Sequence, residues 1–239
     1  MAKGGVRIWS HIGRHIGAEA ISLRVIEVSP GRSPGIAPAE CDDVLFVTEG
    51  TGTIFLDGKA RAIKPDTGIY VRPGVGVAFE NPGPEPLVLV SAQCPEPEAP
   101  PGFAEPVFGA SLETPEVPAV YLWEREAQPT ADRWYRVVVD EAVGSTQVTQ
   151  FVGAIPPGRA PDHFHEYEEV LCILAGEGRM WAGDKNTRIG VGSCVYLPRK
   201  QMHCVENTGS GELRLLGVFY PAGSPAARED PGGSQGDGA

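Results

Sequence analysis

The sequence has no long apolar run, no excess of basic residues and no cysteine framework. Its 239 residues include 20 Lys and Arg against 31 Asp and Glu, which gives a formal net charge of -11. An acidic chain offers no basic patch to nucleic acid or to an anionic membrane surface, so we expect neither as a partner. No run approaches the roughly 20 apolar residues that span a bilayer. The opening MAKGGVRIWS also lacks the apolar core of a signal peptide, so we expect no export.

The cysteines show no CxxC pair and no regular spacing. There are five of them: Cys41, Cys94, Cys172, Cys194 and Cys204. An odd number of scattered cysteines fits reduced thiols better than a secreted disulfide scaffold. We therefore expect a cytoplasmic protein in which these residues are small core side chains.

Helical periodicity is also weak, and turn-forming residues are abundant. The chain has 31 Gly and 23 Pro, which separate short runs rich in Val, Ile, Leu, Phe and Tyr. Many short strands between such turns favour an all-β sandwich or barrel. We predict an all-β fold.

An internal repeat is the first strong positive signal. DDVLFVTEGTGTIFLDGKARAI at 42–63 aligns with EEVLCILAGEGRMWAGDKNTRI at 168–189, at an offset of 126. VRPGVGVAFENPG at 71–83 aligns at the same offset with LPRKQMHCVENTG at 197–209, and PGRSPG at 30–35 matches PGRAPD at 157–162 one residue out of step. The chain is therefore predicted to be a duplication.

The repeat sets the expected domain boundaries. We predict an N-terminal barrel-like domain at 1–100, a Pro-rich linker and connecting segment at 101–132, and a C-terminal domain at 133–221. The last residues, 222–239, are rich in Gly, Pro and Ser and are predicted to be disordered.

The second strong signal is a cluster of metal-ligand types in the second copy. His163 and His165 are two residues apart, Glu169 follows four residues later, and His203 lies on a later strand. Side chains at i and i+2 of a strand project from the same face, so the two histidines can grip one ion. Imidazole and carboxylate ligands suit Fe, Mn, Zn, Ni or Cu rather than Ca, and they do not choose among those metals.

The motifs around these residues resemble the cupin family. PGRAPDHFHEYEEVLCILAGEG at 157–178 matches the first cupin motif, and GSCVYLPRKQMHCVEN at 192–207 matches the second. Two departures, a shifted Gly158 and Lys200 in place of the usual glycine, affect no ligand position. The whole chain is similar to bicupins, which implies two tandem double-stranded β-helix (jelly-roll) barrels with the metal inside one of them, and a homodimer.

By this resemblance His163, His165, Glu169 and His203 are the metal ligands. In the first copy the aligned residues are Ala37, Ala39, Asp43 and either Val77 or Ala78. Asp43 alone cannot hold a transition metal, so the N-terminal barrel is expected to be a metal-free support.

Residues near the ligands have less certain roles. Asp162, Glu166 and Glu168 alternate with the ligands and are predicted to face solvent. Candidate cavity residues are Gln150, Tyr167, Met180, Tyr196 and Phe219. Arg179 would favour an anionic substrate if it faced inward, and an exposed position is at least as well supported.

These features predict a metal-dependent bicupin enzyme that acts on a small organic substrate, such as an oxo, enol or aromatic acid. Dioxygenase-type chemistry is the leading prediction, with Glu169 as the catalytic base. The alternatives are a cofactor-independent isomerase, decarboxylase or aminohydrolase of the bicupin type, and a non-catalytic binding protein. Whether the activity is that of an oxidoreductase or of an isomerase or lyase stays open, because the fold does not select the chemistry.

Overall fold

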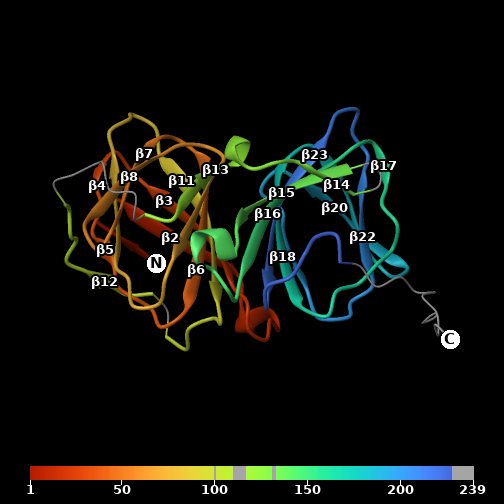
Figure 1. Ribbon diagram of the computed structural model, residues 1–239, viewed down its shortest axis with the longest axis horizontal. Helices are drawn as coiled ribbons and strands as arrows, with labels where there is room; N and C mark the ends of the chain where they lie inside the picture. The colour runs from red at the N-terminus through yellow and green to blue at the C-terminus, as the bar shows by residue number, and fades with distance from the viewer. Residues whose placement is uncertain (100, 110–116, 131–132, 228–239) are drawn as a thin grey trace.

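The computed structural model describes residues 1–99, 101–109, 117–130 and 133–227. Two halves lie side by side along the long axis, and each is built from antiparallel sheets (Figure 1). The all-β prediction and the two-barrel architecture are confirmed. The helical elements of the described chain are single turns, η1 (Arg14–Ile16), η2 (Leu122–Glu124) and η3 (Glu141–Val143). None of them has the length and apolar character that crossing a membrane requires.

The first half contains two sheets. The larger has the strand order β1-β2-β3-β11-β6-β9-β13, and the smaller has the order β12-β5-β10-β7-β8, with β4 also paired to β10. The strands are β1 (Ala2–Lys3), β2 (Val6–Ile12), β3 (Leu23–Val28), β4 (Gly31–Arg32), β5 (Gly35–Ile36), β6 (Asp42–Glu49), β7 (Gly52–Leu56), β8 (Lys59–Ile63), β9 (Thr67–Val71), β10 (Val77–Asn81), β11 (Leu87–Cys94), β12 (Phe103–Ala104) and β13 (Ala119–Tyr121).

The second half repeats this plan with fewer strands. One sheet has the order β14-β15-β16-β23-β18-β21, and the other has the order β17-β22-β19-β20. The strands are β14 (Gln128–Thr130), β15 (Arg133–Val139), β16 (Thr149–Ile155), β17 (Gly158–Arg159), β18 (Glu168–Ala175), β19 (Glu177–Ala182), β20 (Lys185–Gly190), β21 (Cys194–Leu197), β22 (His203–Asn207) and β23 (Leu213–Tyr220).

The same side-chain device closes a turn in both halves. Asn81 donates to the carbonyls of Val28 and Glu85 in the first half. Asn207, its partner in the repeat, donates to the carbonyls of Ile155 and Gly211. Each asparagine thereby satisfies two backbone acceptors, which explains why the ENxG sequence occurs in both copies.

The segment predicted as a linker contributes strands to both halves. β12 pairs with β5 and β13 pairs with β9, so both extend the first half. β14 pairs with β15 of the second half. The Pro-rich composition limits these strands to two or three residues but does not prevent pairing at sheet edges. Of the tail predicted to be disordered, 222–227 are placed against the second half, and 228–239 lie outside the described residues.

Strand alternation divides most of the buried apolar side chains among three large cores. On β6, Leu45 and Val47 face the inside of the first barrel, whereas Val44 and Phe46 face the other half. On β18, Leu171 faces the inside of the second barrel. The core between the halves combines side chains from both larger sheets, so the two barrels share a buried apolar interface.

Candidate metal centre

The four predicted ligands lie at one end of the second barrel. Glu169 is on β18 and His203 begins β22, whereas His163 and His165 lie in the connection between β17 and β18. The backbones of His163 and His203 exchange two hydrogen bonds, of 3.0 and 2.8 Å. This local pairing sets the two imidazoles against each other although they are 40 residues apart in sequence.

The side chains converge on one point. One ring nitrogen from each of His163, His165 and His203 lies within 4.8 Å of the others. Oε2 of Glu169 is 3.4 Å from Nε2 of His203 and 3.8 Å from Nε2 of His165. This buried oxygen has no hydrogen-bond partner within the described part of the chain. A buried carboxylate oxygen without a partner is costly unless a cation satisfies it.

Backbone carbonyls fix the imidazole orientations. Nδ1 of His163 lies 3.1 Å from the carbonyl of Pro161, and Nδ1 of His203 lies 2.8 Å from that of Gln201. Nδ1 of His165 lies 2.9 Å from the carbonyl of Ala227. A carbonyl accepts only, so each Nδ1 carries the proton and each Nε2 presents a lone pair. Metal-binding histidines are held in this way.

The pKa values of two imidazoles are shifted in opposite directions. Burial lowers the pKa of His163 to about 4, and the charge of His203 adds to the decrease. Burial alone would also lower the pKa of His203, but the carboxylate of Glu169 outweighs it and raises that pKa. His163 is therefore a neutral donor at pH 7, and the negative charge of Glu169 that raises the pKa of His203 also favours a cation bound at the centre. The donor set and its geometry fit a divalent transition metal.

A small cavity of about 90 Å³ adjoins the four side chains. Its walls are mainly apolar, and their side chains include Phe151, Ile155, Leu171, Val205, Leu215 and Phe219. Such a cavity offers a small molecule a largely apolar setting beside the four side chains.

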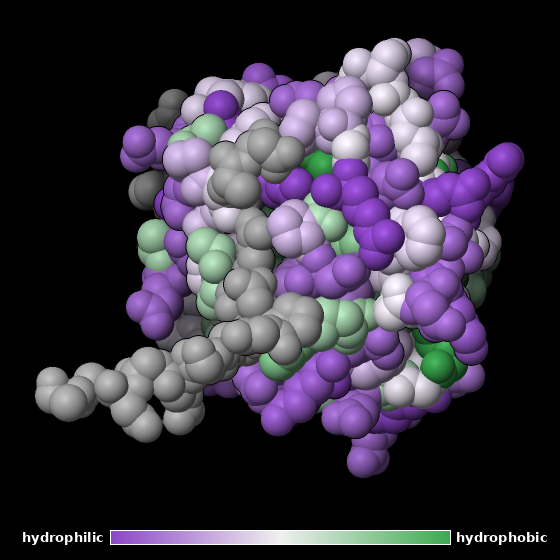
Figure 2. Space-filling view, turned by 90° about the vertical axis from the view of Figure 1, so that its right-hand side faces the viewer, coloured by the Kyte–Doolittle hydropathy of each residue, from purple (hydrophilic) through white to green (hydrophobic). Residues whose placement is uncertain are grey.

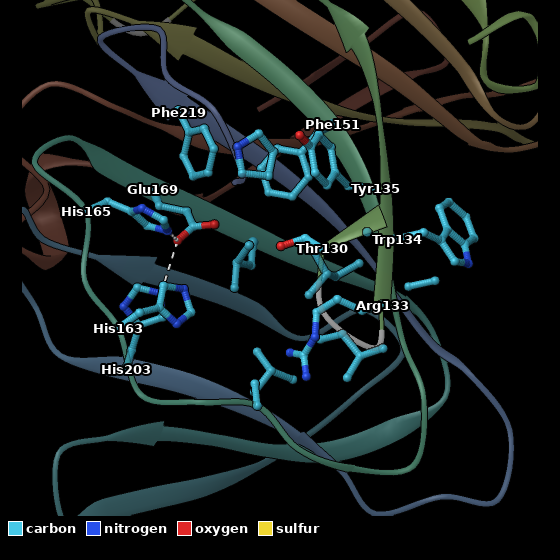
Figure 3. A pocket seen from close by; sticks show the side chains of 18 residues that line it. Thr130, Arg133, Trp134, Tyr135, Phe151, His163, His165, Glu169, His203 and Phe219 are labelled. Carbon is cyan, nitrogen blue, oxygen red and sulfur yellow. Dashed lines mark ion pairs between the residues drawn. The ribbon is translucent and has the colours of Figure 1, made fainter. Parts of the chain in front are cut away.

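Arg133 and Thr130 bring polar groups to the cavity from β15 and β14. Figure 3 shows both side chains entering from the side opposite the histidines, whereas the Trp134 ring points away. Neither Arg133 nor Thr130 was predicted from the sequence, and nor was Pro225 of the C-terminal segment, which also lines the cavity. No sequence signal was available, because these residues lie outside both motifs and reach the site through strand pairing and chain reversal.

Only some of the residues predicted to line the cavity lie at it. Phe219 lines it, and Tyr167 packs against the rings of Phe219 and His165. Met180 is part of the core of the second barrel, and Tyr196 packs at the interface between the halves.

Gln150 and Arg179 also lie away from the cavity. Gln150 is fully buried, and its amide oxygen is so close to Gly68 of the first half that a Cβ there would lie 2.9 Å from it. Arg179 donates to Asn186 on the exposed side of β19. Of the three cysteines near the motifs, Cys194 packs against the core between the halves.

The prediction that Glu168 faces solvent is wrong. Its side chain is fully buried, and its two carboxylate oxygens accept 2.9 Å hydrogen bonds from the backbone N–H groups of Glu19 and Ala20. The Tyr196 hydroxyl donates a third, of 2.5 Å. Glu168 does point out of its own barrel, but that face is covered by the first half. By contrast, Glu166 is 56% exposed beside Lys200, as expected for a solvent-facing position.

The structure also corrects the first-half residues matched to the ligands. β5 pairs Ile36 with Val77, as His163 pairs with His203 in the second half. Ile36, and not Ala37, is therefore equivalent to His163. Of the two residues aligned with His203, the structure selects Val77 over Ala78. The one-residue shift seen upstream in the repeat explains the difference. Asp43 keeps the position of Glu169.

Comparisons with known proteins agree with this architecture. The cupin domain model matches residues 24–92 and 151–219. An uncharacterized protein of Methanocaldococcus jannaschii is 32% identical over 80 residues, covering 32% of this chain and 62% of that protein. An oxalate-binding protein of Thermotoga maritima is 36% identical over 67 residues, covering 27% of this chain and 55% of that protein. The chain thus matches less than two thirds of either curated relative.

Solved structures of Bacillus subtilis oxalate decarboxylase share the two-barrel fold. A deletion mutant aligns with a TM-score of 0.74 at 15% identity, covering 92% of this chain and 74% of that one. A structure used to study the Mn(II) centres of that enzyme aligns with a TM-score of 0.74 at 16% identity, covering 97% and 76%. Similarity at this identity establishes the fold. Since the cupin model matches once in each half, the chain belongs to the cupin family and is a bicupin.

Proposed function

We propose that the second cupin domain binds one divalent transition metal through His163, His165, His203 and Glu169 and acts on a small organic acid. The observation that carries this proposal is the buried Oε2 of Glu169, which has no hydrogen-bond partner among the described residues and faces oriented imidazoles. A metal bound there would act as a Lewis acid toward substrate oxygens and, if redox-active, would enable reaction with O2.

The cavity supports an organic acid as the substrate. Arg133 offers a guanidinium suited to pairing with a carboxylate, and Thr130 offers a hydroxyl beside it. The ligand cluster lies on the opposite side of the cavity, so a substrate can contact the metal and Arg133 together (Figure 3). The cavity of about 90 Å³ beside the ligands suits a small substrate. Oxalate, which is named for two of the similar proteins, is a small organic acid of this class.

Dioxygenase-type chemistry is our leading proposal for the reaction. Within the described cavity lining, Glu169 is the only carboxylate, and aromatic and aliphatic side chains form most of the wall. Such a wall excludes water and leaves little acid–base machinery beyond Glu169. Oxidative cleavage requires less proton transfer by side chains than hydrolysis does.

Non-oxidative decarboxylation or isomerisation is the second candidate. The shared fold with oxalate decarboxylase, an enzyme with Mn(II) centres, favours it. Glu169 would then leave the metal transiently to take or return the proton, since its side chain lines the cavity. Glu169→Gln that keeps its metal and full turnover would remove Glu169 from the proton transfer.

The deciding experiment combines elemental analysis of the purified chain with assays on a panel of 2-oxo acids, enols and aromatic acids. Substrate-dependent O2 uptake selects the dioxygenase. Product formation or CO2 release without O2 selects the second candidate. Metal and acid binding without turnover selects a binding protein, and a chain that takes up no divalent metal contradicts the proposal.

We further propose that the two domains span 1–100 and 133–221, that the protein forms a homodimer and that it is located in the cytoplasm. All five cysteines are free thiols, and four of them are buried, in line with a reducing compartment. Light scattering of the purified chain tests the dimer.

A further inference from the structure

Residues 222–227 follow β23 and fold back along the metal end of the second barrel. The backbone N–H of Gly223 donates to Oγ1 of Thr149 over 3.2 Å, and the Tyr167 hydroxyl donates to the carbonyl of Ser224 over 2.8 Å. Pro225 contributes to the cavity wall. We call 223–227 the C-terminal strap. It is held by contacts at three successive residues rather than at one.

The strap reaches a predicted ligand directly. The carbonyl of Ala227 lies 2.9 Å from Nδ1 of His165. Tyr167, which is itself bonded to the strap at Ser224, stacks on the same ring with centroids 5.0 Å apart and planes 10° apart. The strap therefore fixes both which His165 nitrogen carries the proton and how the ring is turned.

His165 differs in this respect from the other two histidines. The carbonyls facing His163 and His203 belong to Pro161 and Gln201, each two residues away along the chain. The carbonyl facing His165 is 62 residues away. Local backbone geometry orients two ligands, whereas the third depends on a remote segment.

Gly223 permits the close approach. A Cβ at this position would lie 2.3 Å from Cε1 and 2.4 Å from Cζ of Tyr167. The Tyr167 ring cannot move aside freely, because it packs against His165 and Phe219. A side chain at residue 223 must therefore push the strap away from the barrel.

We propose that the C-terminal strap is a positioning element of the metal centre, which holds His165 in its ligating tautomer through the Ala227 carbonyl and closes the cavity with Pro225. This inference rests on the proposed metal function and assigns part of that site to a segment outside both cupin motifs. The strap touches no reacting atom. It acts through His165.

The first experiment measures the affinity of Mn²⁺ and Zn²⁺ for the full chain and for Gly223→Ala by chelator competition. Loss of an outer partner of a metal ligand typically weakens binding by about 10–100-fold, and we expect that loss here. Gly211→Ala is the matched control, because a Cβ at Gly211 meets no atom within 4 Å. Unchanged affinity in Gly223→Ala would overturn the inference.

A second pair of variants removes the strap itself. A chain ending at Ala222 lacks the strap, and a chain ending at Arg228 keeps it with the Ala227 carbonyl still part of a peptide bond. We expect the first to show the same loss of affinity as Gly223→Ala and the second to bind like the full chain. Equal affinity in the two truncated chains would count against the strap as a positioning element.

A third measurement separates this inference from the proposed function. In the metal-free chain, ¹⁵N NMR of the His165 ring reports which nitrogen carries the proton. We expect a single Nδ1–H form in the full chain and in Gly211→Ala, and a mixture of tautomers in Gly223→Ala. A full chain that binds neither ion would contradict the proposed function. An unchanged His165 signal in Gly223→Ala would contradict the positioning role, whether or not metal binds.

Discussion

The two cupin domains place different groups at the same point of the same barrel. In the second domain, Glu169 faces three imidazoles and keeps one buried oxygen without a hydrogen-bond partner among the described residues. In the first domain, Asp43 occupies the equivalent strand position and is paired with Arg24, whose Nη2 lies 2.8 Å from Oδ2. Ser91 donates a 2.6 Å hydrogen bond to the other oxygen of Asp43.

Arg24 takes the place of a pocket residue of the second domain. Strand pairing matches Arg24 with Ser91 and Phe151 with Gly217, and Ser91 and Gly217 correspond in the repeat. Phe151 lies across Gly217, where a Cβ would come within 2.2 Å of its ring. The first domain thus fills with an arginine the space that the second lines with a phenylalanine.

The difference shows how one scaffold balances a buried carboxylate in two ways. Burial raises the pKa of Asp43, and the charge of Arg24 and the Ser91 hydrogen bond counter that rise. The first domain therefore supplies its own cation. The second places three imidazoles beside its carboxylate instead of a guanidinium, so this carboxylate is suited to an exchangeable cation.

The largest expected effect is loss of metal from the second domain alone. His203→Ala removes a ligand of the metal. It should therefore weaken metal binding more than the loss of an outer partner does, which typically lowers affinity by about 10–100-fold. Val77→Ala changes the equivalent residue of the first domain. It should leave metal affinity intact and lower the free energy of unfolding by about 1–3 kcal/mol through lost burial. Chelator competition and urea unfolding measure both quantities, and equal metal loss in the two variants would remove the asymmetry between the domains.

The next effect concerns the stability of the first domain. Arg24→Ala leaves Asp43 as an uncompensated buried charge and should lower the free energy of unfolding by about 3–5 kcal/mol. Metal affinity should not change. The double variant Arg24→Met with Asp43→Leu is the control and should recover much of the loss, since it removes both charges. If Arg24→Ala unfolds like the unmodified chain in urea, the buried pair is not what holds this end of the barrel together.

A smaller effect is expected from the substrate end of the second domain. Arg133→Gln should raise KM for an organic acid about 10–100-fold, because a hydrogen bond to a charged group contributes about 1.5–3 kcal/mol. Metal affinity should stay constant. Arg179→Gln is the matched control, since Arg179 is bonded to Asn186 away from the cavity. An unchanged KM in Arg133→Gln would place substrate binding elsewhere.

The smallest effect is expected from Glu166, and Glu168 of the same motif provides the contrast. Glu166→Ala removes an exposed ion pair with Lys200 and should change the free energy of unfolding by less than about 1 kcal/mol. Glu168→Ala leaves backbone N–H groups of the first half without their acceptor, which costs about 1–3 kcal/mol for each group. Thermal unfolding ranks the two variants. The reverse ranking would contradict the assignment of Glu168 to the interface.

Much of the fold and of the ligand cluster could be predicted because both are local patterns. His163, His165 and His203 gather because the two motifs lie side by side through the pairing of His163 with His203, although His163 and His165 are in a connection and not on the strand that the sequence suggested. Arg133 could not be predicted in the same way, since it enters the cavity from a strand outside both motifs. Side-chain alternation correctly placed Glu168 on the outer face of its own strand. It could not show that the first half of the chain covers that face.

The sequence by itself determined the duplication, the all-β class and which copy carries the histidines, because repeats, turn residues and side-chain periodicity are properties of neighbouring residues. Tertiary structure decided which outward faces are buried between the halves, which strand pairs match across the repeat, and which remote carbonyl holds His165. These depend on contacts between segments far apart in the chain, as between residues 165 and 227, and no local pattern encodes them.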